Sequence, residues 1–170
     1  MKKNHWSIFE MIDVCFEVFT TRDIGRQILR HKTASFQEFS QRYAEVDASQ
    51  MFIRECRLQD TKNRQSSIEV DPCSEVAIWW AEQQEIHIDN AIALYKEALK
   101  RGLAKEQARV VLPEGNTPST MYIKAPLRTW IHYCLLRMGN GTQKEHREIA
   151  KMIWKELQEY FDWLGEIEIG

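Results

Sequence analysis

The stretch Gln27–Tyr43 reads Q-I-L-R-H-K-T-A-S-F-Q-E-F-S-Q-R-Y and contains two clusters of polar side chains. Arg30–Lys32 place three basic groups in a row, so at a helix end they splay outward and can contact several parts of a polyanion. Glu38, Ser40 and Arg42 alternate, and on an extended segment they would share one face. A carboxylate, a hydroxyl and a guanidinium on one face suit a sugar hydroxyl and a phosphate. A solvated helix end would explain the first cluster alone, but the ordered second cluster favours a binding site.

The composition is that of an ordinary water-soluble domain. The chain has 170 residues, 44% apolar and 28% charged, which predicts one domain over residues 1–170 with a real core. A formal charge of −2 favours neither nucleic acid nor an anionic membrane as partner. No apolar run is long enough to cross a bilayer, and M-K-K-N-H-W is not followed by a signal-peptide core. The cytoplasm is therefore the expected location, or the host cytoplasm for a viral protein.

The four cysteines predict neither a metal site nor a nucleophile. They lack C-x-x-C spacing and do not group with histidines, so no zinc site is expected. Buried small hydrophobic side chains are the simplest interpretation in a reducing compartment. The positions are Cys15, Cys56, Cys73 and Cys134.

Elements on either side of the opening stretch follow from hydrophobic periodicity. Alternation over Met11–Thr20 predicts a strand with one packed face. Arg22, Arg26 and Arg30 recur every four residues, so a helix over about Arg22–His31 would carry a basic stripe.

Most of the remaining chain is predicted to be helical. A helix from Pro72 to Leu99, ended by Gly102, would be about 40 Å long and would need a partner surface. Met51–Asp71 is expected to be a loop region with short β-like pieces, and the tail E-I-E-I-G an edge strand or disordered segment. The other expected elements are a short helix over Ala104–Leu112, an extended Thr117–Pro126, a helix over Leu127–Met138 and an amphipathic helix over Thr142–Leu164.

The opening stretch resembles the signature of flavin-dependent thymidylate synthases. That pattern is R-H-R, seven variable residues, then Ser, one residue and Arg. Arg30, His31, Ser40 and Arg42 fall on it, and Lys32 replaces the third basic arginine. Lysine keeps the charge but loses the planar fork, which favours a monodentate contact.

Three further strings match the family in the right order. The segment H-W-S-I-F-E resembles a family segment that borders the flavin, through His5, Ser7, Phe9 and Glu10. A-R-V-V-L-P places Arg109 where the family has an arginine that reaches the nucleotide phosphate from a neighbouring subunit. The third string is L-R-T-W-I-H-Y-C-L-L-R-M, which supplies Arg128, His132 and Arg137. Just before it, Pro126 stands where an asparagine is common in the family.

The resemblance implies an α+β fold, with a mixed sheet and long helices, that lacks the family's N-terminal strand-helix layer. It implies a homotetramer with shared active sites and no nucleic-acid or membrane partner. The implied substrate-binding residues are Gln27, Arg30, Glu38, Ser40, Arg42, Arg109 and Arg137, with Arg137 also catalytic. The implied cofactor-binding residues are Ser7, Arg30, His31, Lys32, Glu38, Arg128 and His132.

The implied reaction is reductive methylation of dUMP to dTMP, with FAD as cofactor and methylenetetrahydrofolate and NADPH as co-substrates. The Arg137 guanidinium at the pyrimidine edge would stabilise negative charge on the ring. Three alternatives stay open: a truncated, non-catalytic relative that binds flavin or nucleotide only; a different flavin-dependent pyrimidine nucleotide alkylation; and a nucleic-acid-binding module using the arginine stripe, against which the net charge argues.

Overall fold

The computed structural model describes residues 6–167, which divide into two compact units. Unit 1 contains residues 6–18, 26–37 and 121–167, and unit 2 contains Phe19–Gly25 and Glu38–Thr120. The elements are η1 (Trp6–Met11), β1 (Asp13–Thr21), α1 (Arg22–Ile28), β2 (Ser35–Glu38), η2 (Ala48–Gln50), β3 (Arg57–Gln59), β4 (Ser67–Glu69), α2 (Glu75–Lys100), α3 (Lys105–Ala108), η3 (Arg109–Val111), β5 (Pro118–Pro126), α4 (Leu127–Arg137), α5 (Lys144–Tyr160) and η4 (Asp162–Glu166). The α+β fold that the resemblance implies is confirmed.

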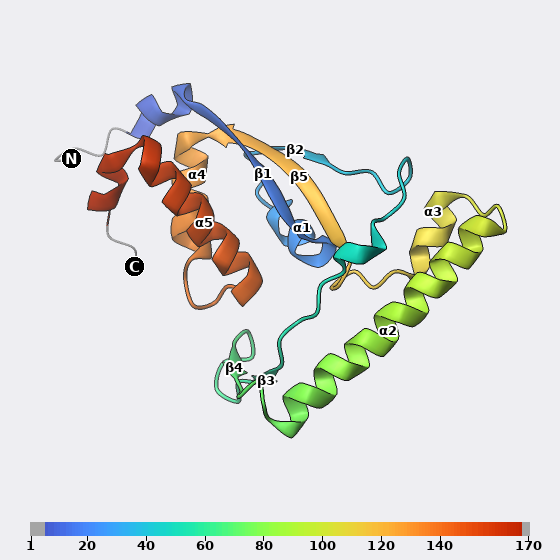
Figure 1. Cartoon of the computed structure of the whole chain (residues 1–170). Helices are drawn as coiled ribbons and strands as arrows, with labels where there is room; N and C mark the ends of the chain where they lie inside the picture. Colours follow the sequence, from blue (N-terminus) through green and yellow to red (C-terminus); the bar gives the residue numbers. More distant parts are fainter. Residues whose placement is uncertain (1–5, 168–170) are drawn as a thin grey trace. The chain divides into compact units, whose positions relative to one another are not determined.

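The main sheet has three strands in the order β1-β5-β2, with β5 in the centre (Figure 1). Side chains of β5 alternate, because Met121, Ile123 and Ala125 are buried whereas Tyr122 and Lys124 are exposed. This is the period-two pattern of a strand that packs one face on a core. The strand predicted over Met11–Thr20 and the extended segment predicted over Thr117–Pro126 are confirmed as β1 and β5. A second, two-stranded sheet pairs β3 with β4 in antiparallel register.

The core of unit 1 lies between the strand residues and the helix pair α4 and α5, which pack against each other. Trp130 of α4 is 2% exposed, and its indole Nε1 donates a hydrogen bond to the Val14 carbonyl oxygen at 3.0 Å. The Phe16 ring meets the Trp130 ring edge-on, with centroids 4.9 Å apart. A buried indole needs such an acceptor, so this contact fixes α4 on β1.

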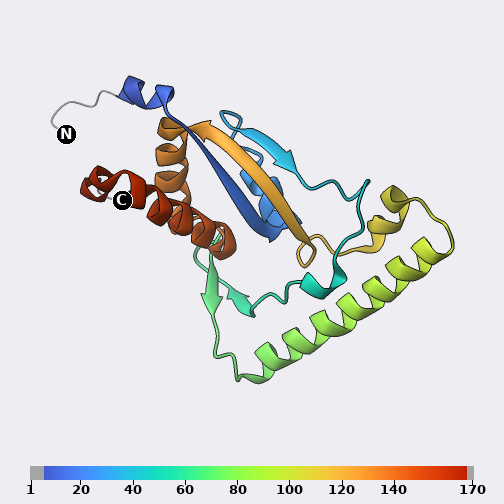
Figure 2. The same cartoon turned by 45° about the horizontal axis from the view of Figure 1, so that its top comes forward.

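Unit 2 is built around α2, a single uninterrupted helix with α3 packed near its C-terminal end (Figure 2). The buried cluster there consists of Val46, Tyr95, Ala108 and Leu112. The Tyr95 hydroxyl accepts a hydrogen bond from the Val46 amide at 3.2 Å. The segment between β2 and η2 is thereby tied to α2.

The first residue of α2 differs from the predicted one, whereas the predicted helix stop is correct. The helix starts at Glu75 rather than Pro72, because the Asp71 carboxylate accepts from the Cys73 amide and holds a turn before the helix. At the other end Gly102 has φ +84°, and the Leu103 amide donates to the Ala98 carbonyl oxygen. This is a Schellman ending, which confirms Gly102 as the helix stop.

The bounds of three other helices also differ from the predicted ones. Helix α1 ends at Ile28 instead of His31, and the expected Ala104–Leu112 helix is divided into α3 and η3. Helix α5 ends at Tyr160, with η4 after it. Residues 168–170 of the tail lie outside the described part of the chain.

The prediction that Glu38, Ser40 and Arg42 share one face of an extended segment is wrong. Strand β2 stops at Glu38, and the amides of Tyr43 and Ala44 both donate to the Ser40 carbonyl oxygen. Ser40 and Arg42 therefore lie in a turn, and local hydrogen bonding overrides the strand. Within residues 6–167, no helix is both long and apolar enough to span a bilayer.

Candidate active site

Two segments far apart in the sequence meet in unit 1. Arg137, the last residue of α4, donates from Nε to the Nε2 atom of His31 at 2.9 Å. His31 follows α1, and its ring meets the Tyr133 ring edge-on with centroids 4.8 Å apart. Both residues are partly buried, so the helix-end arginine is directed into the protein.

His31 accepts this hydrogen bond because it is neutral. Its partial burial and the adjacent Arg137 charge lower the pKa of His31 from 6.5 to about 4. A guanidinium always donates, so His31 Nε2 is the acceptor and its proton lies on Nδ1. The site thus presents a fixed arginine beside a neutral imidazole at neutral pH.

A pocket of about 590 Å³ opens in unit 1 beside the same helix. It is lined by Trp6, Glu10, Thr33, Arg128, Thr129, Ile131, His132 and Leu135. Arg128 is partly held there, because its Nη1 pairs with the Glu10 carboxylate at 3.1 Å. The structure therefore brings together two predicted cofactor residues, Arg128 and His132.

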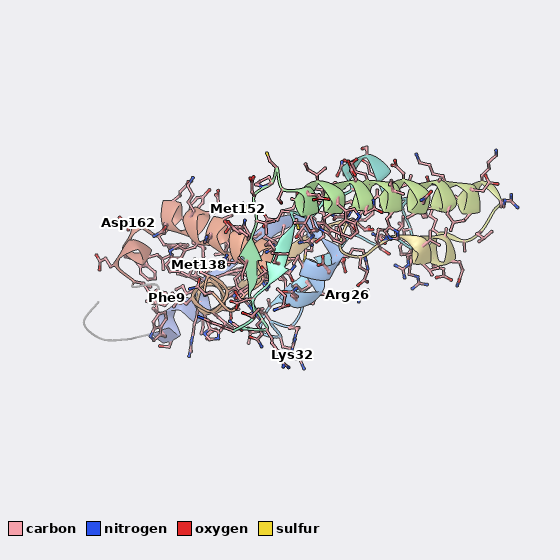
Figure 3. The ribbon with its side chains drawn as sticks, turned by 90° about the horizontal axis from the view of Figure 1, so that it is seen from below. Phe9, Arg26, Lys32, Met138, Met152 and Asp162 are labelled. Carbon is pink, nitrogen blue, oxygen red and sulfur yellow. The ribbon has the colours of Figure 1, made fainter. Side chains whose placement is uncertain are left out.

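The other predicted residues of unit 1 are more exposed. Ser7 lies on η1, and Arg30 and Lys32 follow α1 as exposed residues. Lys32 lies at the outer edge with its side chain directed away from the ribbon (Figure 3). Gln27 is partly buried and donates to the Gln143 side chain at 2.7 Å.

Unit 2 holds Glu38, Ser40, Arg42 and Arg109. Glu38 is the most constrained, because its carboxylate accepts from the Ser119 hydroxyl at 2.7 Å and pairs with Arg22 at 3.3 Å. The Arg22 side chain is only 16% exposed, so Arg22 is not part of a solvent-exposed basic stripe with Arg26 and Arg30. The Glu38 carboxylate is aligned by these two donors.

Arg42 is presented on the turn that follows β2. Its Nε pairs with the Glu106 carboxylate at 3.0 Å, and the two side chains are 64% and 47% exposed. The Lys105 ammonium also donates to the Tyr43 carbonyl oxygen at 3.1 Å. The turn is thereby docked on α3, which runs directly into Arg109.

Sequence reasoning missed several residues that build these sites. Tyr133 and His146 are buried polar groups next to His31 and Gln27, and Ser119 and Thr33 line the Glu38 contact and the pocket respectively. The sequence contains only weak indications of these residues. His146 lies in the first turn of α5, and Tyr133 lies four residues before Arg137.

Comparison with known proteins gives a consistent family. The family model described as "Thymidylate synthase complementing protein" matches residues 1–162. A flavin-dependent thymidylate synthase of Synechocystis sp. is 45% identical over 161 residues, covering 95% of this chain and 73% of the relative. A probable flavin-dependent thymidylate synthase of Paramecium bursaria Chlorella virus 1 is 45% identical over 150 residues, covering 88% and 68%.

A solved structure has the same fold. It is the UMP/dUMP methylase PolB from Streptomyces cacaoi, bound with 5-Br UMP, and it superposes with a TM-score of 0.79. The two chains are 25% identical, and the match covers 96% of this chain and 79% of the other.

Proposed function

Because this chain belongs to the thymidylate synthase complementing protein family, we propose that it catalyses the reductive methylation of dUMP to dTMP. The observation that carries the proposal is the contact between Arg137 and His31, which brings together residues 106 positions apart in the sequence. Both fall on the family strings, and the pocket beside them is of ligand size. An incidental core contact would have no reason to unite two such motifs.

The residues of unit 1 fit FAD as the cofactor. A cavity of about 590 Å³ accommodates a large part of a dinucleotide, and its lining joins apolar side chains to the Arg128 cation and the Thr33 hydroxyl. When bound, FAD supplies reducing equivalents from NADPH while methylenetetrahydrofolate supplies the carbon. Arg128 and His132 would hold FAD in the pocket, with Ser7, Arg30, His31 and Lys32 as further contacts from unit 1.

The chain's own contribution is placement and charge stabilisation. Arg137 would face the pyrimidine edge and stabilise the negative charge that develops on the ring, which makes the neighbouring carbon nucleophilic. Neutral His31 holds the Arg137 Nε, which leaves the terminal nitrogens of the guanidinium for the nucleotide.

Substrate binding would use the residues that the family strings supply in each unit, taken separately. Arg42 and Arg109 would bind the phosphate, and Gln27 and Arg30 would seat the nucleotide from unit 1. Glu38 and Ser40 would accept and donate hydrogen bonds to the sugar. We treat Ser40 as a binding hydroxyl, since the turn around it supplies no general base in the described contacts.

UMP is a second candidate substrate, because the structural neighbour PolB is described as a UMP/dUMP methylase. The two nucleotides differ by one hydroxyl at the sugar. A site built around the Glu38 carboxylate can in principle accept a hydrogen bond from either sugar. The two substrates therefore belong in one assay.

Assembly and location complete the proposal. A homotetramer with shared sites is supported by the exposed apolar residues of α2, which include Ile78, Trp79 and Leu94. Folate would bind at the shared site as the carbon donor. The cytoplasm as location is supported by the four cysteine thiols, all of which are free.

The test is product formation. The purified protein is supplied with FAD, NADPH and methylenetetrahydrofolate, and dUMP or UMP is followed by mass spectrometry. We expect a bound-flavin absorption spectrum and a gain of one CH₂ on dUMP. Methylation of UMP alone would replace dUMP by the second candidate, and a protein that binds flavin without methylating either nucleotide would overturn the proposed reaction.

A further inference from the structure

A line of hydrogen bonds crosses unit 1 through five side chains. The Gln143 amide nitrogen donates to Glu145 at 2.9 Å, and the Gln27 amide nitrogen donates to the Gln143 oxygen at 2.7 Å. The Gln27 oxygen lies 3.3 Å from Nδ1 of His146, and Nε2 of His146 lies 3.0 Å from the Tyr133 hydroxyl. Helices α1, α4 and α5 and the segment before α5 are thereby joined by polar contacts.

The direction of every bond in this line follows from its one charged end. A carboxylate only accepts, so the nitrogen of the Gln143 amide faces Glu145 and its oxygen faces Gln27. The Gln27 oxygen must then face His146, which therefore donates from Nδ1. Nε2 of the neutral imidazole is left as an acceptor, and the Tyr133 hydroxyl donates to it.

Tyr133, at one end of this line, packs against His31, which is the partner of Arg137. The Tyr133 ring packs edge-on against the His31 ring at an interplanar angle of 76°, and His31 accepts from Arg137. Tyr133 is 2% exposed and His146 is 0% exposed, so water cannot replace either partner. Losing one hydrogen bond would leave a buried polar group unsatisfied.

We propose that Tyr133 and His146 are positioning residues that hold the Gln27 amide and the His31 ring, and through that ring the direction of the Arg137 guanidinium. The inference rests on the proposed function in that Arg137 and Gln27 are its nucleotide contacts. It adds two residues that touch neither substrate nor cofactor. If the pair only filled the core, an apolar pair of the same volume would serve equally well.

Two substitutions each remove the hydrogen bond between the Tyr133 hydroxyl and Nε2 of His146. Tyr133→Phe keeps the ring that packs on His31 and deletes only the hydroxyl. His146→Asn places an amide nitrogen near the original Nδ1, which preserves the donor to Gln27 and removes the acceptor for Tyr133. Ile153→Val is the matched control, because Ile153 is buried on the same helix and has an aliphatic side chain.

The readout is a single-turnover rate together with the affinities for FAD and dUMP. We expect Tyr133→Phe and His146→Asn each to lower the rate about tenfold, the upper range for one lost hydrogen bond, with FAD affinity unchanged. The double variant should be no slower than either single variant, because both break the same line. Rates equal to that of Ile153→Val, or losses that add in the double variant, would overturn the proposal.

A second measurement separates this proposal from the proposed function. Nitrogen NMR at neutral pH should show His146 and His31 both protonated on Nδ1, with the His31 signals displaced in Tyr133→Phe. Inactivity of the wild type towards both nucleotides would refute the proposed function, while these tautomers would still support the positioning line. A His146 protonated on Nε2, or His31 signals unaffected by Tyr133→Phe, would contradict the line whatever the activity.

Discussion

Arg42 is a predicted phosphate ligand whose guanidinium is paired with Glu106 on the surface of unit 2. We expect Arg42→Ala or Arg109→Ala to weaken dUMP binding by roughly 1.5–3 kcal/mol, or about ten- to a hundredfold, because each removes a charge-assisted contact. Titration calorimetry measures the change. Arg101→Ala is the control, since Arg101 forms only an exposed pair with Glu97 at the end of α2. Affinities unchanged in both Arg42 and Arg109 variants would place the phosphate elsewhere.

Glu106 gives a prediction of the opposite sign. Its carboxylate competes with a phosphate for Arg42, so Glu106→Gln should tighten dUMP binding. Both side chains are largely exposed, and exposed pairs contribute at most about 1 kcal/mol, so the expected gain is about fivefold or less. The gain should shrink as salt concentration rises. Weaker binding by Glu106→Gln would mean that Glu106 assists the nucleotide instead.

The sequence was most informative where candidate site residues are close together along the chain. Arg30, His31 and Arg42 belong to one stretch that matches the family signature, and their roles remain predictions. Tyr133 and His146 could not be found in this way, because no spacing links them to Gln27. The alternation of Glu38 with Ser40 suggested a shared face, but a hydrogen-bonded turn places them differently.

At the scale of elements, the end of α2 depends on one glycine. Gly102 has φ +84°, a left-handed conformation that costs other residues about 1–2 kcal/mol. A Cβ there meets no atom within 4 Å, so Gly102→Ala should destabilise unit 2 by about that amount through the backbone alone. Urea denaturation measures it. Gly115→Ala is the control, because it also has free space and no positive φ. Equal stability of both variants would contradict the assigned helix ending.

The packing of α4 against α5 predicts a pH dependence of stability. Burial lowers the pKa of His146 from 6.5 to about 4, so the unfolded chain binds a proton that the native chain does not. The free energy of unfolding should therefore fall as pH decreases from about 6.5 to about 4, by up to about 1.4 kcal/mol per pH unit for this histidine. His31, with a similarly lowered pKa, adds a loss of the same sign.

Denaturation curves at pH 7 and pH 5 test this dependence. His146→Asn should reduce the difference between the two pH values, since asparagine does not titrate. An unfolding free energy that is the same at both pH values in the wild type would show that His146 is not a buried neutral imidazole.

Element identities followed from the sequence better than element boundaries. Hydrophobic patterns predicted β1, α2 and α5, and the sequence also indicated an extended segment at β5 and a helix at α4. The first residue of α2 was missed because the Asp71 side chain competes for a backbone amide, which periodicity does not register. The division of the chain into two units was equally invisible, since each unit is assembled from separate segments.

At the scale of the whole molecule, the homotetramer remains a prediction, as does the single domain over residues 1–170. Helix α2 exposes a run of large apolar side chains, with Trp79 55% and Ile86 56% exposed. Such a surface is typical of a protein–protein interface, and a second copy would cover it. Light scattering at micromolar concentration should give four times the chain mass of 20.2 kDa. Trp79→Glu should reduce that mass, and a monomeric wild type that binds flavin normally would contradict the shared site.

Arg137 is the residue proposed to activate the pyrimidine nucleotide for methylation. The most direct test is single-turnover conversion of dUMP by pre-reduced, FAD-loaded protein with methylenetetrahydrofolate, comparing wild type with Arg137→Lys. Lysine keeps the charge but loses the planar fork, so flavin and much of the nucleotide affinity should remain while the rate falls by about two orders of magnitude. Equal rates in the two proteins would contradict the role of Arg137, and no conversion by the wild type would contradict the reaction itself.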